Sequence, residues 1–190
     1  MTLTATAPAL KEWSAVVHAL LDGRQRVLLR KGGIGEKRFE VAAQEFLLFP
    51  TVAHSHAQRV RPEHRDLLQP AAADSTDERL LIRAAAKVVA AQEVNCPDGL
   101  AAIEDLHIWT PESVRADRLD FRPKHKLAVL VVSVIPLAEP VHIARSPDYA
   151  GCKSWVQLPV RPSLAAPVPD PVHDQAALAD VAVRVRDAVG

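Results

Sequence analysis

The longest apolar run of the chain, LAVLVVSVIPL at residues 127–137, constrains the fold more than any other feature. A transmembrane helix needs roughly 20 apolar residues, and this run supplies about half of that length. Valine and isoleucine are frequent in it, and β-branched side chains favour strands. The sequence therefore predicts a buried strand at 127–137 and no association with a membrane.

Shorter patterns predict the remaining elements. Apolar residues at helical spacing predict a helix over 9–21, and Thr110 before Pro111 predicts a helix start, because threonine caps and proline fits the first turn. Alanines in 80–94 favour a helix, but the valines of this segment equally suit a long strand, which we prefer. Further strands are expected at 27–29, 46–49 and 154–158, and helices at 63–68, 98–106, 110–118 and 176–189. These elements predict an α+β fold, with a mixed, largely antiparallel sheet and several short helices in a single domain.

The C-terminal part of the chain differs in composition. Prolines recur at 159, 162, 167, 169 and 171, which predicts a semi-rigid linker over 159–175. Beyond it, Leu178, Val181 and Val185 share one stripe of a helix. We therefore expect a core domain over 1–158, this Pro-rich tail, and a peripheral helix over 176–190 that could recruit a protein partner.

Composition and charge exclude several classes of protein. The 190 residues are 48% hydrophobic and 24% charged, so the chain is too apolar for a disordered protein and long enough for a sizeable core. Two cysteines do not make a disulfide framework, and no basic leader is evident, so the expected compartment is the cytoplasm. Equal totals of 23 basic and 23 acidic residues argue against coating of a polyanion. Residues 1–70 nevertheless hold ten cations against seven acids, which is compatible with a local basic surface.

The densest basic segment, 24–38, contains two adjacent glycines. Cations beside a glycine turn suit phosphate, because charge and exposed backbone N–H groups act together. Neither G-x-x-x-x-G-K-[ST] nor G-x-G-x-x-G occurs, which disfavours the two standard nucleotide-binding loops. The alternative is a solvated hairpin. The predicted phosphate contacts are Arg30, Lys31, Gly32, Gly33, Lys37 and Arg38.

Histidines and one cysteine are candidates for chemistry. The pair His54 and His56 has the spacing of two metal ligands, although ordinary loop histidines are the alternative. His107 precedes a helix start and could act as an acid or base, or simply support the cap. Cys152 beside Lys153 could be a nucleophile with a lowered pKa, or a packing residue. The candidate base-stacking side chains are Trp109 and Trp155.

Five blocks occur in order, namely LKEW at 10–13, RKGGI at 30–34, FLLFPT at 46–51, LHIWT at 106–110 and GCKSW at 151–155. Over about 10–158 the chain thereby resembles an uncharacterised prokaryotic domain-of-unknown-function family. That resemblance implies no established activity. Members are sometimes associated with restriction-modification components, so the resemblance implies a nucleic-acid setting.

Three functions remain in competition. The leading hypothesis is a cytoplasmic nucleic-acid-associated binding or accessory domain, whose basic Gly-Gly hairpin contacts phosphates. The enzyme alternative is a metal-dependent, nuclease-like phosphoester hydrolase with a divalent metal held near Glu36, His54, His56 and His107. The (D/E)-x-K pattern of restriction-type nucleases is absent, and the sequence leaves open whether the chain is an enzyme. The third is a protein-interaction scaffold that uses the C-terminal tail.

Overall fold

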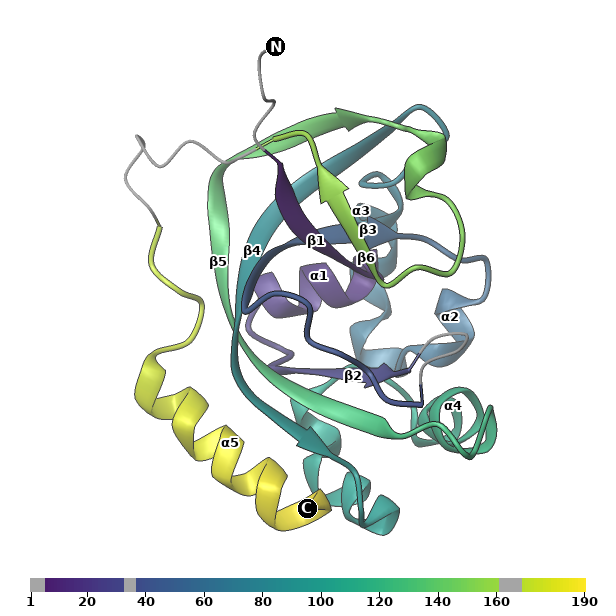
Figure 1. The fold of residues 1–190 in the computed structure, drawn as a ribbon, viewed down its shortest axis with the longest axis vertical. Helices are drawn as coiled ribbons and strands as arrows, with labels where there is room; N and C mark the ends of the chain where they lie inside the picture. The colour runs from purple at the N-terminus through teal and green to yellow at the C-terminus, as the bar shows by residue number, and fades with distance from the viewer. Residues whose placement is uncertain (1–5, 33–36, 161–168) are drawn as a thin grey trace.

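The computed structural model describes residues 6–32, 37–160 and 169–190 as one α+β domain built on a mixed six-stranded sheet (Figure 1). The order across the sheet is β2-β5-β4-β3-β1-β6, and only the β1–β3 pair is parallel. The predicted fold class is therefore confirmed. The strands are β1 (Ala7–Trp13), β2 (Val27–Lys31), β3 (Glu45–Thr51), β4 (Arg79–Glu93), β5 (Leu127–Ala144) and β6 (Trp155–Leu158).

Two long strands form the spine of the sheet. β4 and β5 pair antiparallel along most of their length, with register shifts between Ile82 and Ala84 and between Val88 and Ala90. Such irregularities bend a strand and increase its twist, and both strands curve around α1 (Ser14–Leu21) in Figure 1. The predicted strands at 127–137 and 80–94 are confirmed, and β5 continues past the apolar run to Ala144.

The helix predicted over 9–21 is wrong in its first half. Residues up to Trp13 form β1, and the helix starts at Ser14. Ala9 packs in a smaller core on one side of the sheet and Leu10 in the main core on the other, so the strand alternation buries both residues. Pairing with β3 and β6 on either side supplies the backbone hydrogen bonds that a helix would otherwise make internally.

The basic Gly-Gly segment is not a hairpin. β2 lies at the edge of the sheet and pairs with β5, whereas the next strand, β3, pairs with β1 and β4. β2 and β3 are therefore not neighbours in the sheet, and the predicted hairpin at this segment is wrong. A local glycine signal predicts a turn but carries no information about which strands pair.

Short helices fill the space between the strands. Thr110 caps α4 as predicted, because its Oγ1 accepts a hydrogen bond from the Ser113 N–H at 3.1 Å. The 310 helix η2 starts at Pro97, so Asp98 lies inside its first turn. The helical segments besides α1 are α2 (His56–Arg59), η1 (Pro62–Leu67), α3 (Leu68–Ala72), η2 (Pro97–Leu106), α4 (Pro111–Val114), η3 (Arg115–Asp120), η4 (Pro147–Tyr149) and α5 (Gln175–Val189).

The C-terminal helix α5 packs against the main core. Its apolar stripe, which includes Leu178 and Val185, is buried, and the Asn95 N–H donates to the Val189 carbonyl at 2.8 Å. At Gly99 of η2, an added Cβ would lie 1.7 Å from the carbonyl oxygen of Ala188. The stripe expected to recruit a partner is thus covered by the chain's own core.

The predicted limits of the core domain, the linker and the terminal helix, at 1–158, 159–175 and 176–190, stay a prediction. Among the described helices, none combines the length and the apolar character that a membrane span requires.

Candidate functional site

A buried ion pair joins two strands that are far apart in the sheet order. Glu12 of β1 is 3% exposed, and its Oε2 lies 3.1 Å from Nη1 of Arg30 on β2. The same Nη1 donates to the Lys11 carbonyl at 2.9 Å, and the other oxygen of Glu12 accepts from the Trp13 N–H at 2.9 Å. Because β1 and β2 are separated by three strands, this contact requires the sheet to curl until its two sides meet. The curl of the sheet therefore brings the residues of this site together.

A second guanidinium, that of Arg118 on η3, belongs to the same site. Burial lowers the pKa of Arg118, the negative charge of Glu12 opposes this shift, and the positive charge of Arg30 adds to it. The Arg118 guanidinium carbon lies 5.3 Å from the centre of the Trp109 ring. Within the part of the chain that the structure describes, the Nε atoms of Arg30 and Arg118 are buried and have no hydrogen-bond partner. Both arginines therefore keep donor capacity that the protein does not satisfy.

Lys31 fixes the end of η3. Its ammonium donates to the carbonyl of Arg118 at 2.7 Å and also to the carbonyl of Phe121. Burial lowers the pKa of Lys31, and the charges of Arg118 and Arg122 lower it further. The lysine thus holds the helix end beside the two arginines, and it adds a third positive charge to the site.

Aromatic rings form one wall of the site. The Trp13 ring stacks on His56 with 3.7 Å between centres and meets Trp109 edge-on at 4.8 Å. Arg59 lies over the Trp13 ring at 5.8 Å, and its Nε pairs with Asp117 at 2.5 Å. Burial, with the charge of Arg59, lowers the pKa of His56 to about 4, so this histidine is neutral at pH 7. We call Arg30, Lys31, Arg59 and Arg118, together with Glu12 and Trp13, the cationic cluster.

The comparisons with known proteins identify the family. The family model described as "Domain of unknown function (DUF1802)" matches residues 9–184. The chain belongs to the DUF1802 family. No curated protein matches it. The crystal structure of ASCH from Zymomonas mobilis is similar, with 12% identity, 80% of this chain and 86% of that chain covered, and a TM-score of 0.46.

In this DUF1802 chain, the blocks found in the sequence meet around the cationic cluster. The first block supplies Glu12 and Trp13, the second Arg30 and Lys31, and the fourth Trp109. The third block contributes Thr51, whose hydroxyl donates to the Glu12 carbonyl at 3.1 Å. The fifth block contacts the cationic cluster indirectly, through Phe39. The Trp155 ring stacks on the Phe39 ring with 6.1 Å between their centres, and the guanidinium carbon of Arg30 lies 5.1 Å from the centre of the Phe39 ring. Segments distant in sequence thus share one location.

The predicted phosphate contacts separate into two groups. Arg30 and Lys31 lie in the cationic cluster, and the buried Gly32 follows them. Lys37 and Arg38 are exposed, and Arg38 pairs loosely with Glu93 at 3.8 Å. Gly33 and Glu36, which the sequence also predicted as site residues, lie outside the described residues.

The predicted histidine and cysteine candidates do not gather. His54 is exposed, whereas His56 is buried against Trp13 and accepts from the Ala53 N–H at 3.1 Å. His107 lines a separate cavity, and Cys152 is a free, exposed thiol. Among the described residues, no three His, Cys, Asp or Glu side chains lie close enough together to hold a metal ion.

The two predicted stacking residues are committed to packing. Trp109 is 3% exposed, and Trp155 contacts Phe39 and Phe46 and donates through Nε1 to the Glu40 carbonyl at 3.0 Å. The exposed aromatic side chain beside the cationic cluster is instead Phe121, which is 57% exposed. Sequence reasoning missed Arg59, Arg118 and Phe121, because isolated arginines and phenylalanines in irregular segments carry no spacing signal.

Proposed function

We propose that this chain binds nucleic acid through phosphate contacts at the cationic cluster. The observation that carries the proposal is the unsatisfied donor capacity of Arg30 and Arg118, whose Nε atoms have no partner among the described residues. A phosphate oxygen accepts guanidinium hydrogen bonds well, and charge-assisted bonds of this kind are stronger than neutral ones. A phosphate bound at the cationic cluster would offer its oxygens to the guanidinium groups of these arginines, whose donors the protein only partly satisfies.

The charge balance of the cluster supports an anionic ligand. Four cations face two carboxylates, those of Glu12 and Asp117, and one of these, Glu12, is buried beneath the arginines. Burial lowers the pKa of both Lys31 and Arg118, and the positive charges of neighbouring arginines lower it further, which supports a site that favours an added negative charge. An incoming phosphate would relieve this repulsion.

Phe121 supports a polynucleotide over a free phosphate ion. Its ring is exposed next to the segment that Lys31 holds, and the Arg122 guanidinium lies 5.0 Å from its centre. Exposed aromatic rings beside a basic groove stack on bases without much sequence preference. This arrangement suits an unpaired strand, with phosphates on the arginines and a base on Phe121.

The test is a titration of the protein into short single-stranded DNA and RNA. Fluorescence anisotropy measures the binding at several salt concentrations. Arg118→Gln is expected to weaken binding of every sequence alike and to reduce the salt slope by about one. Phe121→Ala is expected to weaken binding without changing that slope, because it removes stacking and no charge. The matched control is Arg79→Gln, since Arg79 is exposed on β4 and has no ion pair among the described residues. The proposal fails if wild type does not bind at low salt, or if Arg118→Gln behaves like Arg79→Gln while both remain folded.

A further inference from the structure

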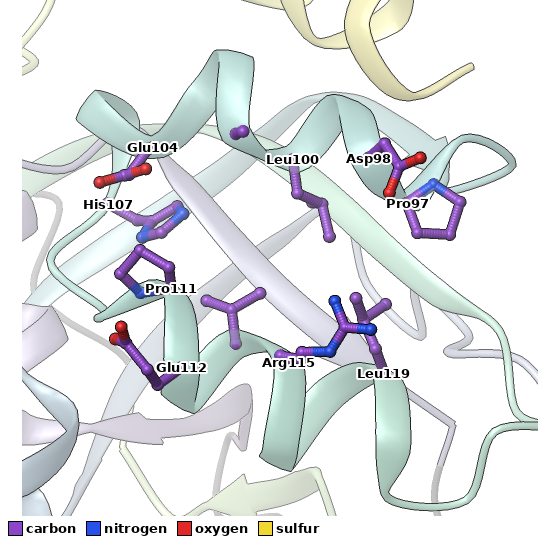
Figure 2. Close-up of a pocket in the computed structure, with 11 residues that line it drawn as sticks. Pro97, Asp98, Leu100, Glu104, His107, Pro111, Glu112, Arg115 and Leu119 are labelled. Carbon is purple, nitrogen blue, oxygen red and sulfur yellow. The ribbon is translucent and has the colours of Figure 1, made fainter.

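A cavity of about 360 Å³ lies between η2 and the α4–η3 segment (Figure 2), and Arg118 is not among the residues that line it. Leu100, Val114 and Leu119 contribute apolar surface to it. Its volume is within the range of small-molecule sites, which are commonly apolar with a few polar groups that fix orientation. The polar groups of this cavity therefore indicate what it could hold.

His107 is the buried polar group of the cavity. The residue is 2% exposed, and its Nδ1 accepts a hydrogen bond from the Trp109 N–H at 3.2 Å. Burial, with the charges of Arg61 and Arg118, lowers the pKa of His107 to about 3, so the ring is neutral at pH 7. In a neutral ring whose Nδ1 accepts, the proton resides on Nε2. No hydrogen bond joins this Nε2–H to another described residue, so it can donate to a molecule in the cavity.

Carboxylates lie beside this donor. Figure 2 shows Glu104 and Glu112 at the same end of the cavity as His107, with Asp98 and Arg115 toward the other end. Glu104 is already 3.7 Å from Arg61, whereas Glu112 is exposed and has no ion pair among the described residues. The site therefore offers one neutral donor and adjacent strong acceptors on an apolar surface.

We propose that this cavity binds an amino-substituted nucleobase, such as adenine or cytosine. A ring nitrogen would accept from His107 Nε2–H while the neighbouring exocyclic amine donates to Glu112. The apolar side chains would cover the faces of the base. A phosphate is excluded because carboxylates outnumber the single arginine, and a simple guanidinium cation would leave His107 without an acceptor.

The same base could come from two sources, a free nucleoside or a nucleotide of a bound strand. The α4–η3 segment carries both Arg118 and the cavity residues Val114 and Leu119, so the cationic cluster and the cavity share one structural element, and a strand bound at the cluster is one source of the base. The nucleoside version does not depend on the proposed phosphate site. Its failure can thus be separated from the failure of the proposed function.

The experiment is calorimetric titration of the full chain with adenosine, cytidine, uridine and agmatine. Adenosine and cytidine are expected to bind at least about tenfold more tightly than uridine, which lacks the amine that donates to a carboxylate. Glu112→Gln should weaken adenosine binding about tenfold, since hydrogen bonds to a charged group are stronger than those to an amide. Glu78→Gln, an exposed carboxylate on another part of the surface, is the matched control and should change nothing. Leu119→Trp should fill the cavity and abolish binding.

Oligonucleotides separate the two sources. If the base belongs to a bound strand, Glu112→Gln weakens oligo(dC) but not oligo(dT), whereas a free-nucleoside site leaves both unchanged. The proposal is overturned if no nucleoside binds, if uridine binds as well as adenosine, if agmatine is preferred, or if Glu112→Gln binds adenosine like wild type.

Discussion

The buried carboxylate of Glu12 provides a quantitative test of the cationic cluster. Glu12→Gln preserves the volume of the side chain and removes its charge. The amide oxygen can still accept from the Trp13 N–H, so the main change is the loss of the ionic contact with Arg30. The same substitution removes the negative charge of Glu12 that opposes the lowering of the Arg118 pKa by burial. The variant therefore isolates the electrostatic contribution of one carboxylate.

The expected magnitude follows from the geometry. At 3.1 Å, two unit charges attract each other by about 5 kcal/mol when the effective dielectric constant is about 20. Dehydration of the carboxylate offsets much of this attraction in the native protein. Removal of a hydrogen bond to a charged partner costs roughly 1.5–3 kcal/mol, and we expect about 2.5 kcal/mol here. With a urea m-value of about 2.5 kcal/mol/M for a chain of this size, the unfolding midpoint should fall by about 1 M.

The assay is urea unfolding followed by tryptophan fluorescence and circular dichroism. The matched control is Glu45→Gln, because the Glu45 side chain is 73% exposed and pairs with Lys87 across the sheet at 3.4 Å. Exposed pairs contribute little, so this variant should change the free energy of unfolding by less than about 0.5 kcal/mol. If Glu12→Gln is no more destabilising than Glu45→Gln, the carboxylate does not hold the curled sheet together, and our account of the site is wrong.

Two further predictions concern stability. Burial alone would raise the pKa of Asp74, but hydrogen bonds from His18 at 2.6 Å and Arg83 at 2.8 Å outweigh it and hold the pKa below its usual value of 3.8. A carboxyl group whose pKa is lowered by folding stabilises the fold at pH values above its unfolded pKa. The loss of unfolding free energy in Asp74→Asn, measured by unfolding at several pH values, should therefore be largest at pH 5–7 and become smaller below about pH 4. A loss that does not change with pH contradicts this reasoning. Gly99→Ala would place a methyl group against the Ala188 carbonyl and should cost roughly 1–3 kcal/mol, accompanied by faster hydrogen exchange in α5, whereas wild-type exchange would disprove the close packing.

Local sequence signals predicted most elements correctly. The β-branched run of β5 and the Thr110 cap with Pro111 are decided by residues that are neighbours in the chain. The error at 9–21 arose because the same apolar residues can satisfy a helical stripe or a two-sided strand. Ala9 and Leu10 face different cores, and that requires partners on both sides of β1, which no local pattern reveals.

In the candidate site, too, the sequence predicted some residues, and only the tertiary structure revealed the others. The sequence identified Arg30 and Lys31 as basic residues next to glycines, but it predicted that they lie on a hairpin with an accessible surface. The structure instead places Arg30 on Glu12 and directs Lys31 to the end of η3. The other cations of the cluster come from segments that carry no motif, so their positions could not be inferred from spacing.

The sequence by itself determined the α+β class, because strand and helix preferences act over a few residues. It also determined the local excess of positive charge in the first 70 residues. Only the tertiary structure decided where that charge acts. Glu12 and Arg30 meet because the six-stranded sheet curls, and this depends on pairings between strands distant in the chain. The free energy of such pairings comes from burial of both faces of the sheet, which is a property of the whole fold.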